Sequence, residues 1–145
     1  MKFSAVVLAA AAATGATADA VFNVRDFKAS CIPHSAMCNY SFNVIQPGTM
    51  DTEGYECTAN VPGAGAGELP EVKAGTCLPS SRTFDVVRSD EGLTLTVSVQ
   101  VSPNSFTKGS HLIPKKDIET VKGTTPTGDV QAYTGPKDFP LEYAN

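Results

Sequence analysis

The sequence predicts an all-β protein: a compact antiparallel β-barrel or β-sandwich, held together by two disulfides and followed by an irregular C-terminal tail. Three observations favour this fold class. Apolar and polar residues alternate over several short segments, which is the pattern of half-buried strands. No segment sustains the apolar period of about 3.6 residues that marks an amphipathic helix. Turn-forming residues separate the segments at the short spacing found in small sandwiches and barrels.

Residues 1–20, MKFSAVVLAAAAATGATADA, have the pattern of a secretory signal peptide. Lys2 precedes an alanine-rich apolar run, and residues 18–20 supply the small-x-small pattern after which signal peptidase cleaves. The run is shorter than the roughly 20 residues that a membrane-spanning helix needs. We therefore expect an extracellular protein whose mature chain starts at Val21. A retained N-terminal helix is the alternative.

The length and charge of the remaining chain indicate its organisation and its partners. Residues 21–119 are expected to form one domain, because a chain of this length matches a single domain and can bury a core. The formal net charge is −4, and it is the same without residues 1–20 because Lys2 and Asp19 cancel. A mildly acidic chain without a basic cluster is not expected to bind nucleic acid or an anionic membrane.

Four cysteines, Cys31, Cys38, Cys57 and Cys77, predict a disulfide framework, because an even number of cysteines is typical of a secreted domain. Three pairings are possible. We favour Cys31–Cys38 with Cys57–Cys77, because each bond then closes a local loop. Crossed pairings stay open, since the sequence does not fix connectivity. A zinc site is not expected, because neither pair has the usual spacing of zinc ligands.

The first half of the mature chain predicts three short strands. The first covers residues 22–27, with a bulge near Asp26. In the second, over residues 39–44, aromatic and aliphatic residues alternate with Asn and Ser. A turn separates it from the third strand, over residues 54–59. Residues 62–67, PGAGAG, are expected to form a flexible loop, because glycine adds no side chain that could pack.

The second half contains the clearest strand of the sequence. Over residues 93–101 Leu and Val alternate with Thr, Ser and Gln, which predicts a long strand with one apolar and one hydroxyl-bearing face. The segments 72–78 and 83–88 lead to it, and residues 89–92 form a turn that ends in glycine. Residues 106–113 are expected to return as its antiparallel partner.

From residue 120 the pattern changes. Residues 120–145 combine prolines, glycines and scattered aromatic residues without a period. They predict an extended, partly disordered tail. We expect Tyr133, Phe139 and Tyr143 to dock on the barrel rather than engage a partner.

Side chains that could support catalysis are few and match no catalytic motif. The candidates considered are two histidines, a serine and two pairs of acidic turn residues: His34, His111, Ser35, Asp51, Glu53, Asp90 and Glu91. His34 and Ser35 are adjacent and point apart in an extended chain, so they form no nucleophile–base pair by themselves. His111 could meet Asp26 or Ser35 only through the fold. We therefore expect no enzymatic activity, no catalytic residue, no metal and no cofactor.

One modification motif is present. Asn39-Tyr40-Ser41 fits the N-x-[ST] acceptor for an N-linked glycan. It lies on a predicted strand beside Cys38, which could restrict access. Asn39 is the candidate glycosylation site.

The segment VFNVRDFKASCIPHSAMCNYSFNV, followed by YECTANVP, TCLPSSRTFDVV and GLTLTVSVQV, resembles the Alternaria major-allergen family of small secreted fungal proteins. The resemblance covers residues 21–115. It implies a compact β-barrel or β-sandwich without enzymatic activity, in a group of allergens, elicitors and ligands of plant defence proteins. It also matches Cys57 and Cys77 to the first barrel disulfide of the family, and places Cys31 and Cys38 in a subgroup. The allergens carry further cysteines for a second pair and a covalent dimer. This chain has none after Cys77, so a disulfide-linked dimer is not expected.

Two functions follow as hypotheses. The first is a non-enzymatic secreted fungal protein that binds a host extracellular protein, or elicits or suppresses host defence. The alternative is an extracellular binding module that holds a small apolar ligand or a glycan inside the barrel. The interior of the strand over residues 93–101 distinguishes them, because a packed aliphatic core leaves no room for a ligand. A hydrolase is a distant third.

Overall fold

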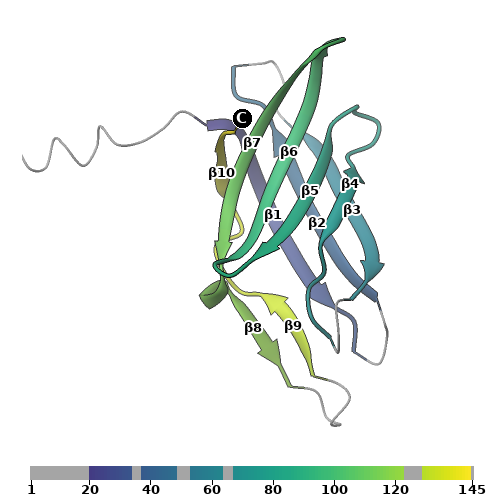
Figure 1. The fold of residues 1–145 in the computed structure, drawn as a ribbon, viewed down its shortest axis with the longest axis vertical. Coiled ribbons are helices and arrows are strands. Elements are labelled where there is room, and N and C mark those ends of the chain that lie inside the picture. The colour runs from purple at the N-terminus through teal and green to yellow at the C-terminus, as the bar shows by residue number, and fades with distance from the viewer. Residues whose placement is uncertain (1–19, 34–36, 49–52, 64–66, 123–128, 145) are drawn as a thin grey trace, which may run out of the picture.

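Ten antiparallel strands form the sheet of a computed structural model, which describes residues 20–33, 37–48, 53–63, 67–122 and 129–144 (Figure 1). The strands are β1 (Ala20–Cys31), β2 (Met37–Ile45), β3 (Tyr55–Pro62), β4 (Val72–Thr76), β5 (Thr83–Ser89), β6 (Gly92–Ser102), β7 (Ser105–Pro114), β8 (Ile118–Val121), β9 (Val130–Tyr133) and β10 (Phe139–Tyr143). A short 3-10 helix, η2 (Lys115–Asp117), joins β7 to β8. The all-β prediction is confirmed. Within the described ranges, no helix is long and apolar enough to cross a membrane.

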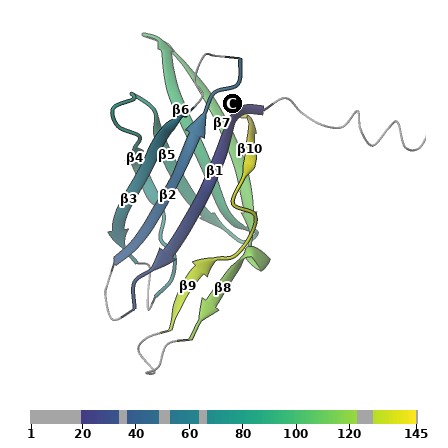
Figure 2. The same ribbon diagram turned by 180° about the vertical axis from the view of Figure 1, so that it is seen from behind.

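Eight of these strands close into a barrel. Strands β1 to β7 follow one another around the sheet, and β10 pairs with both β7 and β1 to complete the ring. On the β1 side, Phe22 faces Leu141 and Val24 faces Phe139. The hairpin of β8 and β9 projects from one end of the barrel (Figures 1 and 2) and joins β1 at the single pair Ser30–Ala132.

A bulge in β1 explains how its apolar residues all reach the interior. Phe22 and Val24 are buried at even positions, whereas Phe27, Ala29 and Cys31 are buried at odd positions. The register with β2 shifts between Arg25 and Lys28, and Asp26 has a φ of 55°. One extra residue therefore turns the inward face from even to odd numbers. The bulge predicted near Asp26 is confirmed.

Aromatic rings meet across the barrel interior. The ring of Phe42 on β2 lies 5.7 Å from that of Phe27 on β1 and 5.0 Å from that of Phe84 on β5, measured between centroids. On β6, Leu93, Leu95 and Val97 are buried against the same core. Side chains from β1, β2, β5 and β6 thus fill the interior, and they include the aliphatic face predicted for β6.

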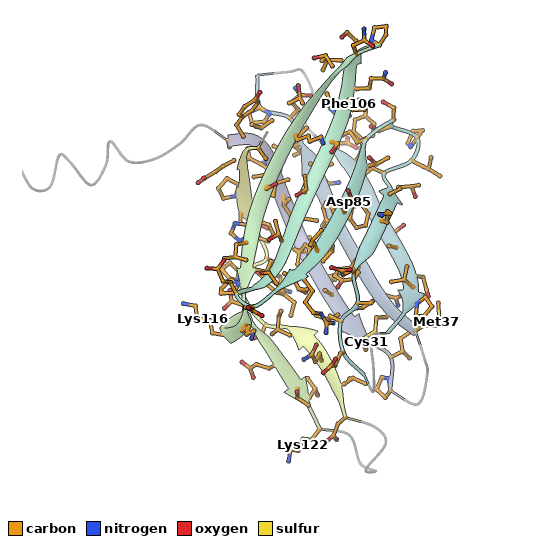
Figure 3. All side chains as sticks on the ribbon, in the orientation of Figure 1. Cys31, Met37, Asp85, Phe106, Lys116 and Lys122 are labelled. Carbon is orange, nitrogen blue, oxygen red and sulfur yellow. A yellow bond between two sulfur atoms is a disulfide. The ribbon has the colours of Figure 1, made fainter. Side chains whose placement is uncertain are left out.

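The outer end of β6 departs from that prediction. Val101 is 58% exposed, although it continues the apolar alternation. The hairpin of β6 and β7 extends past the neighbouring strands (Figure 1), so its last residues have no opposite wall to pack on. Phe106, which is 55% exposed, lies on this hairpin, at the end of the molecule opposite Cys31 and Lys116 (Figure 3).

Both disulfides have the predicted pairing. Cys31–Cys38 joins β1 to β2, and Cys57–Cys77 joins β3 to the residue that directly follows β4. Strands β3 and β4 share one residue pair, Thr58–Thr76, and the second disulfide lies directly beside it. That bond therefore secures the weakest seam of the barrel. All four cysteines are buried, and two disulfides in a small β-barrel fit an extracellular protein.

The structure corrects the expectation of an irregular tail from residue 120. Residue 120 lies inside β8, and residues 130–133 and 139–143 form β9 and β10. Phe139 is buried, and its ring lies 5.4 Å from that of Phe27, whereas Tyr143 is 69% exposed. The strands were missed because each is short, and because Pro140 within β10 disfavours a ladder strand. The docking expected for Phe139 and Tyr133 is confirmed, but Tyr143 does not dock.

Candidate functional site

A cleft of about 880 Å³ opens at the barrel end that carries the β5–β6 turn. Its apolar lining residues come from three parts of the chain: Leu69, Leu93 and Ile118. Its charged lining residues are exposed: Glu68, Glu71, Arg88, Asp90 and Lys115. Such a mixture of apolar and charged groups suits contact with a peptide segment better than enclosure of an apolar molecule.

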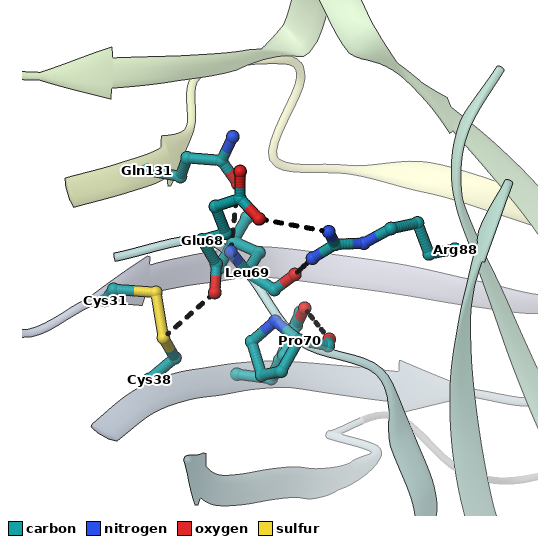
Figure 4. The surroundings of a disulfide bond; sticks show 8 residues. Cys31, Cys38, Glu68, Leu69, Pro70, Arg88 and Gln131 are labelled. Atoms are coloured by element: carbon teal, nitrogen blue, oxygen red, sulfur yellow. Dashed lines mark hydrogen bonds and ion pairs between the residues drawn. A yellow bond between two sulfur atoms is a disulfide. The ribbon is translucent and has the colours of Figure 1, made fainter. Parts of the chain in front are cut away.

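The floor of this cleft is a short segment that closes the barrel end, residues 67–71, which we call the plug segment. Leu69 at its centre is 1% exposed and belongs to the core. Side chains from three strands hold the segment: Tyr40 on β2, Arg88 on β5 and Gln131 on β9. Figure 4 shows Arg88 and Gln131 beside it. The amide of Leu69 donates to Oε1 of Gln131 at 2.9 Å. The plug segment is therefore fixed from several sides and forms a firm floor.

Arg88 makes several of the polar contacts that fix the plug segment. Its Nη2 donates to the carbonyl oxygen of Leu69, and its Nη1 lies 3.3 Å from Oε1 of Glu68. The backbone amide of Arg88 donates to the carboxylate of Glu71 at 2.9 Å. Arg88, Glu68 and Glu71 thus hold one another. Asp90 and Lys115 remain as the exposed rim charges whose side chains take no part in fixing the plug segment.

Tyr40 supports the plug segment from inside the barrel. Its hydroxyl donates to the carbonyl oxygen of Pro70 at 2.7 Å, and the side chain is buried. Burial raises the pKa of Tyr40 far above its ordinary value, and the charge of Arg88 opposes this rise. The phenol therefore stays neutral at any physiological pH, and its hydroxyl remains a hydrogen-bond donor. Sγ of Cys38 lies 3.6 Å from the carbonyl oxygen of Glu68, a van der Waals contact because a disulfide sulfur has no proton to donate.

His111 lies away from the cleft, on β7. Its ring stacks on Phe139 with centroids 4.2 Å apart and an interplanar angle of 21°. Burial lowers the pKa of His111, while the charges of Glu142 and Asp117 oppose the shift. Nearby, burial and the charge of Asp117 raise the pKa of Tyr133 to about 12. These residues form the joint between β7, β9 and β10, which is a packing role.

The acidic and histidine candidates are dispersed by the fold. Asp90 lies on the cleft rim, and the carbonyl oxygen of Glu91 accepts a hydrogen bond from the amide of Lys115 at 3.2 Å. Glu53 is exposed. Asp26 forms an ion pair with Lys28 at 3.4 Å. His34, Ser35 and Asp51 lie outside the described residues. Across the described part of the chain, no group of three or more His, Cys, Asp or Glu side chains could hold a metal ion.

Two parts of this site could not be recognised in the sequence. Arg88 and Gln131 carry no motif, and they meet the plug segment only because β5 and β9 pass beside it. Asp90 lies in a predicted turn and is exposed, but its position in the sequence does not indicate the cleft that it borders. Asn39 is exposed on the outer wall of the barrel, while its neighbours Cys38 and Tyr40 are buried.

No protein-family model matches the chain, and no curated protein matches it significantly. The resemblance to the Alternaria allergens therefore stays a prediction that rests on the quoted motifs.

Proposed function

We propose that this chain is a secreted, non-enzymatic fungal protein that acts by binding an extracellular protein of a plant host through the cleft. The observation that carries the proposal is the composition of the cleft: a fixed apolar floor beneath exposed charges of both signs. A floor that is already ordered loses little conformational entropy when a partner binds. Secretion is supported by the N-terminal pattern and by the two disulfides.

The rim charges indicate what the cleft accepts. Arg88 is already engaged by Glu68 and by the plug segment, which leaves Asp90 and Lys115 as exposed charges of opposite sign. Between them the partly exposed Ile118 offers apolar surface, and the buried Leu69 and Leu93 form the base beneath it. We therefore expect the partner to present a loop in which an apolar side chain is flanked by a basic and an acidic residue.

The test is capture of a partner from plant apoplastic fluid by the disulfide-intact secreted protein. The wild type is compared with the cleft variants Asp90→Lys and Lys115→Glu. The matched controls are Glu56→Lys and Lys73→Glu, which reverse exposed charges on the outer wall at β3 and β4. We expect the controls to retain the partner and the cleft variants to bind it at least about tenfold more weakly, or about 1.4 kcal/mol.

Three results would contradict the proposal. One is capture of no specific protein by the wild type. Another is equal capture by the cleft variants and the controls. The third is loss of a host response in a folded His34→Ala/His111→Ala variant, because it would point to chemistry at the histidines instead of surface recognition.

The alternative function, a ligand held inside the barrel, has less support. The rings of Phe27, Phe42 and Phe84 pack across the interior, and Leu95 and Val97 are fully buried beside them. A ligand there would have to displace packed side chains.

A further inference from the structure

Asn39 lies on the outer wall of the barrel, with its acceptor motif displayed on one face. Because side chains alternate along a strand, Asn39 and Ser41 of β2 both point outward, while Tyr40 between them points into the core. Asn39 is exposed, and Ser41 is half-buried. The two residues that define the motif therefore share the solvent face, and the middle residue contributes to folding.

The side chains that flank Asn39 and Ser41 across the ladders are polar. In the ladder, Asn39 lies between Ser30 on β1 and Asn60 on β3, and both are exposed. At the next outward position, Ser41 lies between Lys28 and Thr58. No aromatic or branched aliphatic side chain stands at these positions, so a bulky group on Asn39 can extend over the wall without disturbing the core.

The part of this wall around Asn39 and Ser41 is a poor surface for a protein partner. Interface centres are enriched in aromatic residues, Met and Arg and depleted in Ser and Lys, whereas the residues that flank Asn39 and Ser41 across the ladders are Ser, Asn, Thr and Lys. None of these residues lines the cleft. A covering on the wall and a partner in the cleft are therefore compatible.

We propose that Asn39 carries an N-linked glycan, and that this glycan covers the outer wall formed by β1, β2 and β3 while the cleft stays open. The donor is a lipid-diphosphate-linked oligosaccharide of the secretory pathway. The amide nitrogen of Asn39 forms a bond to the anomeric carbon of the sugar, and the bond from that carbon to the diphosphate oxygen breaks. The lipid diphosphate leaves, and the amide nitrogen loses one proton. This proposal does not depend on the proposed binding function.

The test is secretion of the full chain, with its own residues 1–20, from a yeast host. We expect the protein in the medium to carry a single N-glycan, which peptide N-glycosidase removes while converting Asn39 to Asp in the peptide map. Asn39→Gln and Ser41→Ala abolish the glycan. Ser41→Thr retains it, and so does Asn60→Gln, which changes the exposed neighbour that lies in no acceptor motif. A secreted chain with the unmodified mass would overturn the proposal.

Lysine acylation rates test whether the glycan covers the outer wall. Acylation of Lys28, beside Ser41 in the ladder, is expected to be several-fold slower in the glycosylated protein than after enzymatic removal of the glycan. Acylation of Lys115 on the cleft rim is expected to be equal in both. Equal rates at Lys28 would contradict the covering. If the chain does not reach the medium, a yeast signal peptide replaces residues 1–20, which separates failure of the native leader from failure at Asn39.

Discussion

Two arginine side chains lie beside the two ends of β5 and contact the residues packed there. Arg82 precedes β5, and its guanidinium lies 4.9 Å from the centroid of the Tyr55 ring and 6.0 Å from that of Phe22. Arg88, near the other end of the same strand, holds the plug segment. The Arg82 guanidinium lies over an aromatic ring, whereas the Arg88 side chain, which is 40% exposed, donates to the plug segment. One arginine therefore stabilises the packing beside each end of β5.

Replacement of Arg88 tests this arrangement. Arg88→Met keeps an apolar stem but removes the hydrogen bond to the carbonyl of Leu69 and the ion pair with Glu68. We expect the free energy of unfolding to fall by about 1 to 2 kcal/mol, since the group is partly exposed and its interactions are screened. Denaturant unfolding measures the change. Arg25→Met, at an exposed position of β1, is the control and should cost less than about 0.5 kcal/mol.

His111 gives the protein a defined dependence on pH. Because its pKa is lowered in the folded state, the unfolded chain binds more protons between that value and the ordinary 6.5. The free energy of unfolding should therefore decrease as pH falls from about 7.5 through 6.5 and the folded-state pKa. His111→Gln should flatten this dependence, with His34 present in both proteins. An NMR titration midpoint of His111 at or above 6.5 would be inconsistent with its burial against Phe139.

At the scale of the elements, strand β6 is buried in the core over one part of its length and exposed to solvent over the rest. β6 is buried at Leu93, Leu95 and Val97, yet it ends in the exposed Val101. The alternation of residue types is uniform along its length, so the pattern defines which face is apolar but not where the barrel ends. That limit is set by the length of the neighbouring strand, because β5 pairs with β6 only from Gly92 to Ser98.

Paired truncations along β6 test this difference. Leu95→Ala removes a fully buried side chain from the core and should cost about 2 to 5 kcal/mol. Val101→Ala, at 58% exposure, should change the free energy of unfolding by less than about 0.5 kcal/mol. Urea unfolding of both variants gives the comparison. A similar cost at both sites would mean that the hairpin end packs against something in solution.

The sequence was informative where one strand carries a complete local signal. The alternations of β2 and β6 and the bulge of β1 depend on neighbouring residues only, and all three were predicted correctly. The disulfide pairing was also local. By contrast, β9 and β10 are too short to show a period. They are strands because β8 pairs with β9, and because β1 and β7 both pair with β10. The cleft depends on four separate segments, so no local pattern could reveal it.

The whole molecule depends on β10, the strand that closes the ring. Leu141 faces Phe22 across the β1–β10 ladder and is fully buried. Gly109 on β7 leaves room for Leu141 and Phe22 to pack against this strand. A Cβ at position 109 would lie only 3.0 Å from each of them, which is closer than ordinary van der Waals contact. The C-terminal segment is therefore part of the core and not an appendage.

Side-chain truncations within β10 test whether this strand is part of the core or an appendage. Leu141→Ala should destabilise the protein by about 2 to 5 kcal/mol, as expected for a core leucine. Tyr143→Ala, on the same strand at 69% exposure, should leave the stability within about 0.5 kcal/mol of the wild type. Thermal and urea unfolding report both. Equal and small effects would mean that the barrel is stable without its closing strand.

The ring closure has a consequence for the order of folding. β1 pairs with β10 through Phe22 and Leu141, so the first and the last strand of the barrel to be synthesised must come together. The local hairpins β1–β2, β5–β6 and β6–β7 can form as the chain emerges. The edge of β1 that faces β10 stays unpaired until β10 has been synthesised. Closure over such a sequence separation is slow compared with hairpin formation. The nascent chain is therefore most open to mispairing and chaperone contact at the β1 edge, until β10 arrives.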